Sequence, residues 1–195
     1  MRTDPSHEST GSQDTLTSGE PDGALSEVWQ GLEDEDAAVA AERASEIRDK
    51  VALYARFGLK RGLAATIYDT ALENEIDPDV AFGLVRAESS FRNSSTSPVG
   101  AIGLTQLMPK TASSLQPGVT RSQLREPATN LRIGFKYLRQ LMDKYEGNER
   151  LALLAYNRGP GTVDREIRRG RNPDNGYADF VYGKEDHGHK LYTGR

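Results

Sequence analysis

Apolar residues recur at three- and four-residue spacing along most of this chain, and that periodicity restricts its fold more than any other feature. In the stretch DPDVAFGLVRAESSF, residues 77–91, Ala81, Leu84 and Val85 fall on one face of a helix. No segment alternates apolar and polar residues over the length of a strand. The sequence therefore predicts an all-α protein, with at most a small hairpin near residues 96–104.

Proline, glycine and aspartate mark where the predicted helices begin and end. Asp77 is a good N-cap for a helix that opens at Pro78, and Gly58 is typical of a helix C-terminus. The first helical segment is expected as one long helix or as two with a break near residues 34–37. Further helices are predicted at residues 59–75, 108–115, 127–147, 148–159, 161–169 and 177–182, with one turn possible between residues 117 and 127.

Domain organisation follows from the change in composition along the 195 residues. Residues 1–24 carry Ser, Thr, Gly, Asp, Glu and Pro with few large apolar groups, so we expect a disordered tail. Residues 25–58 are expected to form a helix or helices that pack on the domain. Residues 59–195 are expected to form that domain, which is large enough for its own core.

Composition excludes several classes of function. The chain has no cysteine, which rules out disulfides and zinc sites built on thiolates. A net charge of −4 gives no basic footprint for nucleic acid. No apolar run reaches the length of a membrane span, and the first residues lack the pattern of a signal peptide. His187 and His189 stand two apart in a Gly-flanked tail and are not expected to hold a metal, so no metal or cofactor is predicted.

Glu88 is the ionisable residue that the helical pattern singles out. It lies seven residues after Ala81 and so continues the apolar face, whereas Asp79 and Arg86 are expected on the solvated side. Burial and the negative end of the helix dipole would both raise the pKa of its carboxyl. A carboxylic acid that keeps its proton near neutrality can protonate a leaving oxygen, as glycosidic cleavage requires. The alternative is a half-exposed helix-end residue paired with Arg86 or Arg92.

The loop that follows Glu88 favours a binding site. Gly100 and Gly103 permit close approach of backbone to a ligand, and several hydroxyl side chains surround them. Gln106 brings an amide donor and acceptor into an otherwise apolar segment. A plain connecting loop with Gln106 facing water is the alternative.

Three ordered motifs resemble those of the soluble lytic transglycosylase family. They are Glu-Ser-Ser-Phe (residues 88–91), Ser-Pro-Val-Gly-Ala-Ile-Gly-Leu-Thr-Gln-Leu-Met-Pro (97–109) and Ala-Tyr-Asn-Arg-Gly-Pro-Gly-Thr-Val (155–163). The helix at 130–138 resembles the one that the family places between its second and third motifs. The resemblance spans about residues 62–182 and implies a lysozyme-like, all-helical fold that cleaves the glycan strands of bacterial peptidoglycan.

The resemblance also implies roles for individual residues. Glu88 matches the catalytic acid. The positions that match sugar-contacting or orienting residues of the family are Ser97, Gln106, Met108, Tyr156, Asn157 and Tyr177. Two departures stand out: Thr105 replaces a usual Met, and RNPDNGY lacks the Glu-Thr that often precedes the late Tyr.

The implied reaction uses one carboxyl group twice. Glu88 would protonate the glycosidic oxygen between N-acetylmuramic acid and N-acetylglucosamine and then take the proton of the C6 hydroxyl, leaving a 1,6-anhydro end. A goose-type lysozyme-like hydrolase with Asp164 or Asp179 as helper is one alternative, and an inactive glycan-binding module is another. The expected partner is peptidoglycan in the cell envelope, periplasmic or extracellular, with the enzyme acting as a monomer.

Overall fold

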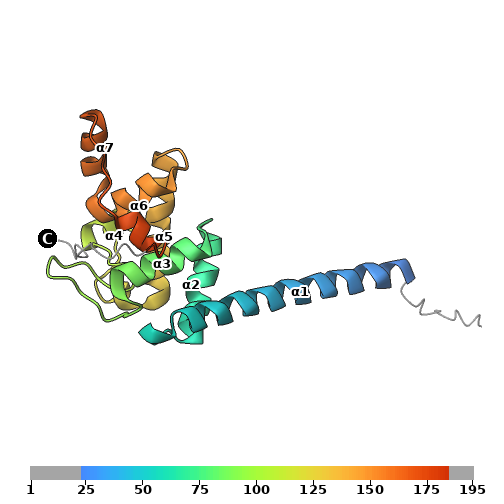
Figure 1. The fold of residues 1–195 in the computed structure, drawn as a ribbon. Coiled ribbons are helices and arrows are strands. Elements are labelled where there is room, and N and C mark those ends of the chain that lie inside the picture. Colours follow the sequence, from blue (N-terminus) through green and yellow to red (C-terminus); the bar gives the residue numbers. More distant parts are fainter. Residues whose placement is uncertain (1–22, 185–195) are drawn as a thin grey trace, which may run out of the picture. The chain divides into compact units, whose positions relative to one another are not determined.

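The computed structural model describes residues 23–184 of the chain, with the side chains of residue 27 and residues 30–184. These residues form α-helices and short 3-10 helices (Figure 1). In chain order the elements are α1 Gly23–Leu53, η1 Ala55–Phe57, α2 Arg61–Glu73, α3 Pro78–Ser89, α4 Pro109–Leu115, η2 Gln123–Arg125, α5 Pro127–Lys144, α6 Glu149–Arg158, α7 Pro160–Arg168 and α8 Tyr177–Val181. The predicted tail and the histidine pair at 187 and 189 lie outside the described residues.

The described residues contain no extended strand, so the predicted all-α class is confirmed. In the predicted hairpin region they form two isolated antiparallel bridges, Thr96 with Ile102 and Ile102 with Leu107. The first helical segment is one helix rather than two. Gly58 follows η1 in the left-handed conformation, with a φ of 71°, as expected for the residue that ends a helical segment.

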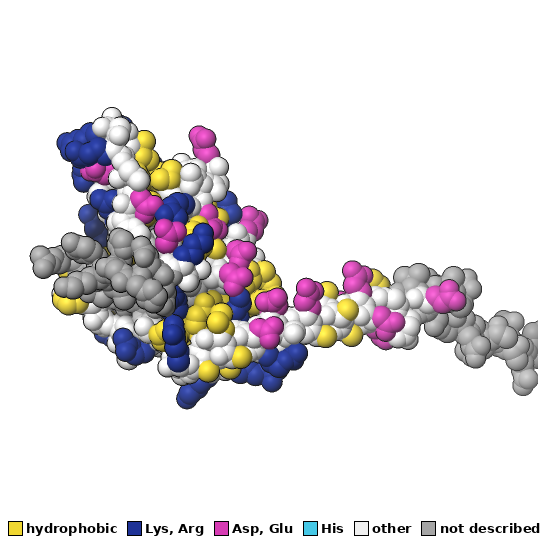
Figure 2. Space-filling model, in the orientation of Figure 1, with side chains coloured by type: hydrophobic (Ala, Val, Ile, Leu, Met, Phe, Trp, Pro, Cys, Tyr) yellow, Lys and Arg dark blue, Asp and Glu magenta, His cyan; other side chains and the backbone are white. Residues whose placement is uncertain are grey.

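The chain divides into two compact units, with the boundary between Arg43 and Ala44 inside α1. In the first unit the side chains of residues 27 and 30–42 are exposed to solvent, and that of Arg43 is half-buried. They include the acidic run from Glu33 to Asp36, and Figure 2 shows acidic side chains along α1. The predicted split into a tail, residues 25–58 and residues 59–195 stays a prediction.

The second unit holds the hydrophobic core. Helix α3 contacts α2 on one side and α8 on another, while α5 packs against α2, α4 and α6. The main cluster contains the fully buried Phe82, Leu84, Leu131 and Phe135. Burial of such side chains stabilises a fold by about 1.5–3 kcal/mol each. A smaller apolar cluster, which includes Ile102, Leu107 and Ile133, packs the loop after α3 onto α5.

The last part of α1 belongs to this second core. Ile47 is only 2% exposed, and the ammonium group of Lys50 pairs with Asp79 at the start of α3. Just after the helix, the ring of Tyr54 stacks on Phe82 with 6.0 Å between centroids. Residues 44–54 therefore contribute directly to packing around α3.

Arg86 corrects one expectation from the helical pattern. It was expected on the solvated side of α3, yet it is 6% exposed. Its guanidinium donates to the carbonyl oxygen of Phe180 and lies 4.4 Å from the centre of that ring. Helix α8 covers this side of α3, and an arginine can be buried there because a carbonyl and an aromatic face receive it.

Candidate active site

The sequence around α3 places Glu88 in the last turn of the helix. The Asp77 side chain accepts a hydrogen bond of 2.7 Å from the backbone N–H of Asp79, so the helix begins where the N-cap pattern predicts. After Glu88 the chain turns sharply, because Ser90 and Phe91 both adopt the left-handed conformation, with φ of 51° and 60°. The left-handed conformation costs about 1 kcal/mol for each such residue, and packing contacts must offset that cost. The buried ring of Phe91 supplies such contacts.

Helix α8 reaches Glu88 because α3 carries a glycine at the crossing point. A Cβ atom at Gly83 would overlap the backbone carbonyl of Val181. The absence of a side chain at this position lets the two helices approach closely, which brings Tyr177, at the start of α8, to the end of α3.

The Tyr177 hydroxyl donates a hydrogen bond to Oε1 of Glu88. Burial raises the pKa of Glu88 from 4.5 to about 7, and the Tyr177 hydrogen bond opposes part of that rise. Burial and the neighbouring Glu88 also raise the pKa of the Tyr177 hydroxyl well above its usual value, so it remains a donor. The pair holds a carboxyl that titrates near neutrality in a fixed orientation.

Tyr156 approaches the same carboxyl from α6. Burial and, to a smaller extent, the charge of Glu88 raise the pKa of the Tyr156 hydroxyl. That hydroxyl donates a 2.9 Å hydrogen bond to the backbone carbonyl of Thr105, and the ring packs on Tyr137 with 5.2 Å between centroids. Tyr156 therefore connects the neighbourhood of Glu88 to the loop that carries Gln106.

Gln106 is held by its own loop. Its φ of 47° is left-handed, and its side-chain nitrogen donates to the carbonyl oxygens of Gly103 at 2.9 Å and Ser95 at 3.3 Å. Ser97 closes the preceding turn, because its hydroxyl accepts a 3.0 Å hydrogen bond from the backbone N–H of Ala101. Met108 is 40% exposed just before α4.

Asn130 organises this loop from beneath, a role that sequence reasoning missed. It is fully buried in α5. Its Oδ1 accepts from both the N–H and the hydroxyl of Thr105 at 2.8 Å, and its Nδ2 donates to the carbonyls of Ile102 and Leu124 at 2.9 Å. An amide in the first turn of a predicted helix was the available signal, because a buried Asn needs several partners.

Asn157 receives its partner from the segment before α8. Its Oδ1 accepts a 3.0 Å hydrogen bond from Nδ2 of Asn175, and Oδ1 of Asn175 accepts from the N–H of Tyr177 at 3.3 Å. Asn175 belongs to the RNPDNGY stretch and was not predicted as a site residue. Despite the departure of that stretch from the family pattern, Tyr177 lies against Glu88.

The predicted site residues thus form a connected set with different relations to Glu88. Tyr177 contacts its carboxyl directly and Tyr156 lies within its electrostatic reach. Among residues 30–184, we find no hydrogen bond from Glu88 to Ser97, Gln106, Met108 or Asn157. The functional roles of all seven stay predictions.

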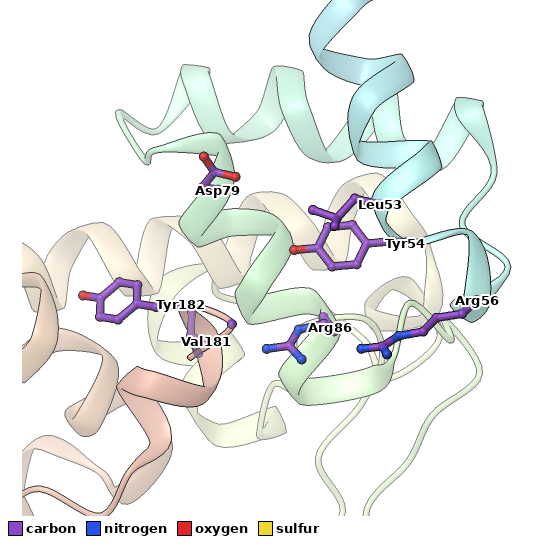
Figure 3. Close-up of a pocket in the computed structure, with 8 residues that line it drawn as sticks. Leu53, Tyr54, Arg56, Asp79, Arg86, Val181 and Tyr182 are labelled. Atoms are coloured by element: carbon purple, nitrogen blue, oxygen red, sulfur yellow. The ribbon is translucent and has the colours of Figure 1, made fainter. Parts of the chain in front are cut away.

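A separate pocket of about 560 Å³ opens on the other side of α3 (Figure 3). Arg86, one of its lining residues, is two positions from Glu88 and so about 200° away around the helix. The other lining residues are Leu53, Tyr54, Arg56, Asp79, Val181, Tyr182 and Gly183. Glu88 does not line this pocket, so the two features are distinct.

Within the described part of the chain, no three His, Asp or Glu side chains are grouped in a way that could hold a metal ion. The same residues include no helix that is both long and apolar enough to span a bilayer.

Proteins named as transglycosylases match just under half of the chain. A transglycosylase from Enterobacteria phage PRD1 is 44% identical over 94 residues, and the match covers 48% of this chain and 34% of the phage protein. The soluble lytic murein transglycosylase of Salmonella typhimurium is 39% identical over 95 residues, covering 46% of this chain and 15% of the relative. This chain therefore matches only a minor part of each relative's length.

A solved structure gives the same comparison for the fold. An inactive mutant of the lytic transglycosylase Slt from Pseudomonas aeruginosa aligns with a TM-score of 0.54 at 32% identity, over 60% of this chain and 22% of that one. The expected lysozyme-like helical fold is thereby confirmed. The model of the transglycosylase SLT domain matches residues 66–177, more than half of the chain, and these residues include Glu88, Tyr156 and Tyr177. The chain belongs to the transglycosylase SLT domain family.

Proposed function

We propose that this chain is a peptidoglycan lytic transglycosylase that cleaves the β-1,4 bond between N-acetylmuramic acid and N-acetylglucosamine. The observation that carries the proposal is the half-buried carboxyl of Glu88, which accepts a hydrogen bond from Tyr177 and has a pKa of about 7. Family membership and the names of the relatives support the same class of activity. No cofactor is needed for this chemistry.

In the first step, protonated Glu88 gives its proton to the glycosidic oxygen as the bond from that oxygen to C1 of the muramic acid breaks. A pKa near the working pH is the condition under which one group can both give and take a proton efficiently. The hydroxyl of Tyr177 orients the carboxyl and stabilises the carboxylate that remains.

In the second step, the C6 hydroxyl of the same sugar attacks C1. Its proton passes to the Glu88 carboxylate, the new bond from O6 to C1 closes the 1,6-anhydro ring, and Glu88 is again protonated. No water is consumed. A hydroxyl tethered to the reacting sugar has a large advantage in effective concentration over solvent.

Asp164 and Asp179, the carboxylates considered above as helpers, each form an ion pair with a basic side chain. Asp164 pairs with Lys144 at 2.9 Å and accepts from the Tyr145 hydroxyl at 2.9 Å, and these contacts lower its pKa. Asp179 pairs with Arg150 at 2.7 Å. These contacts favour a mechanism with one carboxyl over a hydrolase with two, which places its second carboxyl across the sugar.

The remaining site residues are proposed to bind sugar. Gln106 and Asn157 would hold acetamido groups through their side-chain amides, while Ser97 and Met108 would line the path of the glycan. The glycan strand is the proposed partner, reached in the cell envelope, with the chain acting as a monomer. Residues 59–195 are proposed as the catalytic domain.

Digestion of purified peptidoglycan followed by mass analysis of the muropeptides tests the proposal. Products with anhydro ends, lighter by one water than reducing ends, are the expected result. Reducing ends would assign a lysozyme-like hydrolase instead. Absence of products together with retained pelleting on peptidoglycan would assign a glycan-binding module.

A further inference from the structure

Arg150, in the first turn of α6, joins two carboxylates that stand on either side of Tyr177. Its Nε and Nη2 donate to Oδ2 of Asp174 at 3.0 and 2.5 Å. Its Nη1 and Nη2 donate to the two carboxylate oxygens of Asp179, each at 2.7 Å. Asp174 lies three residues before Tyr177 and Asp179 lies two residues after it. One guanidinium therefore fixes the chain on both sides of the tyrosine.

Helix α8 is too short to hold its position and orientation without contacts from other elements. It has only five residues, and helices of that length do not persist without tertiary contacts. Its N-cap, Gly176, has a φ of 79° and provides no side-chain cap. The direction in which the Tyr177 side chain leaves the helix thus depends on contacts from neighbouring elements.

Asp174 uses different oxygens for its local turn and for Arg150. In the turn before Tyr177, Oδ1 of Asp174 accepts a 2.8 Å hydrogen bond from the N–H of Gly176. Oδ2 of the same carboxylate binds Arg150. The turn and the ion pair can therefore be separated by substitution.

We propose that Arg150, Asp174 and Asp179, here called the Arg150 clamp, position Tyr177 so that its hydroxyl meets the carboxyl of Glu88. These three are positioning residues: they act through Tyr177 and do not contact Glu88. The proposal rests on the proposed function, in which Glu88 is the acid. It assigns α6 a second task beyond carrying Tyr156 and Asn157, namely holding α8 in register with α3.

The test replaces Asp174 and Asp179 by Asn, singly and together. In Asp174→Asn the side-chain carbonyl can still accept from Gly176, while the charge that binds Arg150 is removed. We expect Tyr177 to lose its fixed contact with Glu88. The readout is NMR titration of the Glu88 carboxyl in protein labelled with ¹³C-glutamate, with Glu88→Gln to assign the signal. Because the Tyr177 hydrogen bond lowers the pKa of Glu88, the pKa is expected to rise by about 1 in the double variant.

A double-mutant comparison separates positioning from general loosening. In a Tyr177→Phe background the hydroxyl is already gone, so Asp174→Asn and Asp179→Asn should add nothing further to the pKa of Glu88. Asp143→Asn is the matched control, because it breaks an arginine pair of similar geometry on α5, from Arg139 at 2.5 Å. That control should leave the pKa of Glu88 unchanged.

Kinetics on peptidoglycan supply the second readout. The double variant should lose about tenfold in kcat with little change in KM, and the alkaline limb of its pH profile should move to higher pH. An unchanged Glu88 pKa in the folded variants, or an equal rise in the Tyr177→Phe background, overturns the clamp. If the double variant does not fold, either single variant, Asp174→Asn or Asp179→Asn, is sufficient for the comparison with the Tyr177→Phe background. If the proposed function is wrong, the wild-type protein will form no products from peptidoglycan. The NMR titration of Glu88 in the variants would still test the Arg150 clamp in that case.

Discussion

At the residue scale, the environment of Glu88 combines two effects of opposite sign. Burial raises the pKa of the carboxyl to about 7, and the Tyr177 hydroxyl moderates that rise. Without the hydrogen bond from Tyr177, the pKa of the carboxyl would be higher, and the group would give its proton less readily to a leaving oxygen. A carboxyl exposed to solvent, with its usual low pKa, would not be protonated at neutral pH. The tyrosine thus adjusts the acidity of the group as well as its orientation.

Replacement of Glu88 by Gln removes the transferable proton while keeping the shape of the side chain. We expect the rate of anhydro-product formation to fall at least ~10²-fold, the usual contribution of a general acid. The circular dichroism spectrum should stay that of the wild type. Glu166→Gln is the control, since Glu166 pairs with Arg171 at 2.6 Å on α7 and should retain activity. A Glu88→Gln enzyme at full rate would show that another group protonates the leaving oxygen.

The raised pKa of Glu88 also predicts a dependence of stability on pH. Because the folded pKa of about 7 exceeds the usual 4.5, the stability that protonated Glu88 contributes is fully present below about pH 4.5 and is lost as the pH rises through about 7. Glu88→Gln has no proton to lose. We therefore expect the variant to be more stable than the wild type by up to ~3 kcal/mol above pH 7, with the difference vanishing near pH 4. Urea unfolding at pH 4, 6 and 8 measures this, and a difference that does not depend on pH would contradict the shift.

At the scale of elements, the crossing of α3 and α8 explains how residues far apart in sequence form one site. Gly83 allows the backbone contact with Val181, Arg86 binds Phe180, and Tyr177 then lies at Glu88. The site is therefore assembled by helix packing, and its geometry should respond to changes at the crossing that do not touch Glu88.

Gly83→Ala tests this dependence. The added methyl group would overlap backbone rather than a flexible side chain, so α8 must move away. We expect a loss of ~1–3 kcal/mol in the free energy of unfolding and a fall in activity that exceeds the fraction unfolded. Gly62→Ala, in α2, is the control, because nothing lies within 4 Å of its Cβ position. That change should stabilise the protein slightly, and a Gly83→Ala variant as stable and active as Gly62→Ala would contradict the packing argument.

Local signals predicted the elements well, and long-range packing explains what they did not predict. Asp77 with Pro78, and Pro127, mark helix starts that the structure confirms, and burial raises the pKa of Glu88 in the expected direction. Arg86 was placed on the wrong side because its partner, Phe180, is 94 positions away. The roles of Asn130 and Asn175 likewise depend on backbone groups and side chains brought close only by the fold.

At the scale of the whole molecule, α1 combines two kinds of sequence in one helix. Residues 30–42 are exposed, whereas Ile47 and Lys50 are buried in the second unit. An exposed helical stretch buries little apolar surface and so adds little to stability, since most helical stability in proteins comes from packing. The contact boundary between Arg43 and Ala44 therefore predicts where the chain can be shortened.

Two truncations make that prediction quantitative. Deletion of residues 1–43 should change the free energy of unfolding by no more than ~1 kcal/mol and leave turnover of peptidoglycan intact. Deletion of residues 1–58 also removes Ile47 and Tyr54, whose ring lies 4.9 Å from Phe91 and stacks on Phe82. Because loss of a large core side chain costs ~2–5 kcal/mol, this longer deletion should destabilise the protein severely and reduce activity with it. Equal stability of the two truncated proteins would place the start of the folded catalytic unit at residue 59, whereas loss of folding in the shorter deletion would show that the exposed part of α1 is needed for the fold.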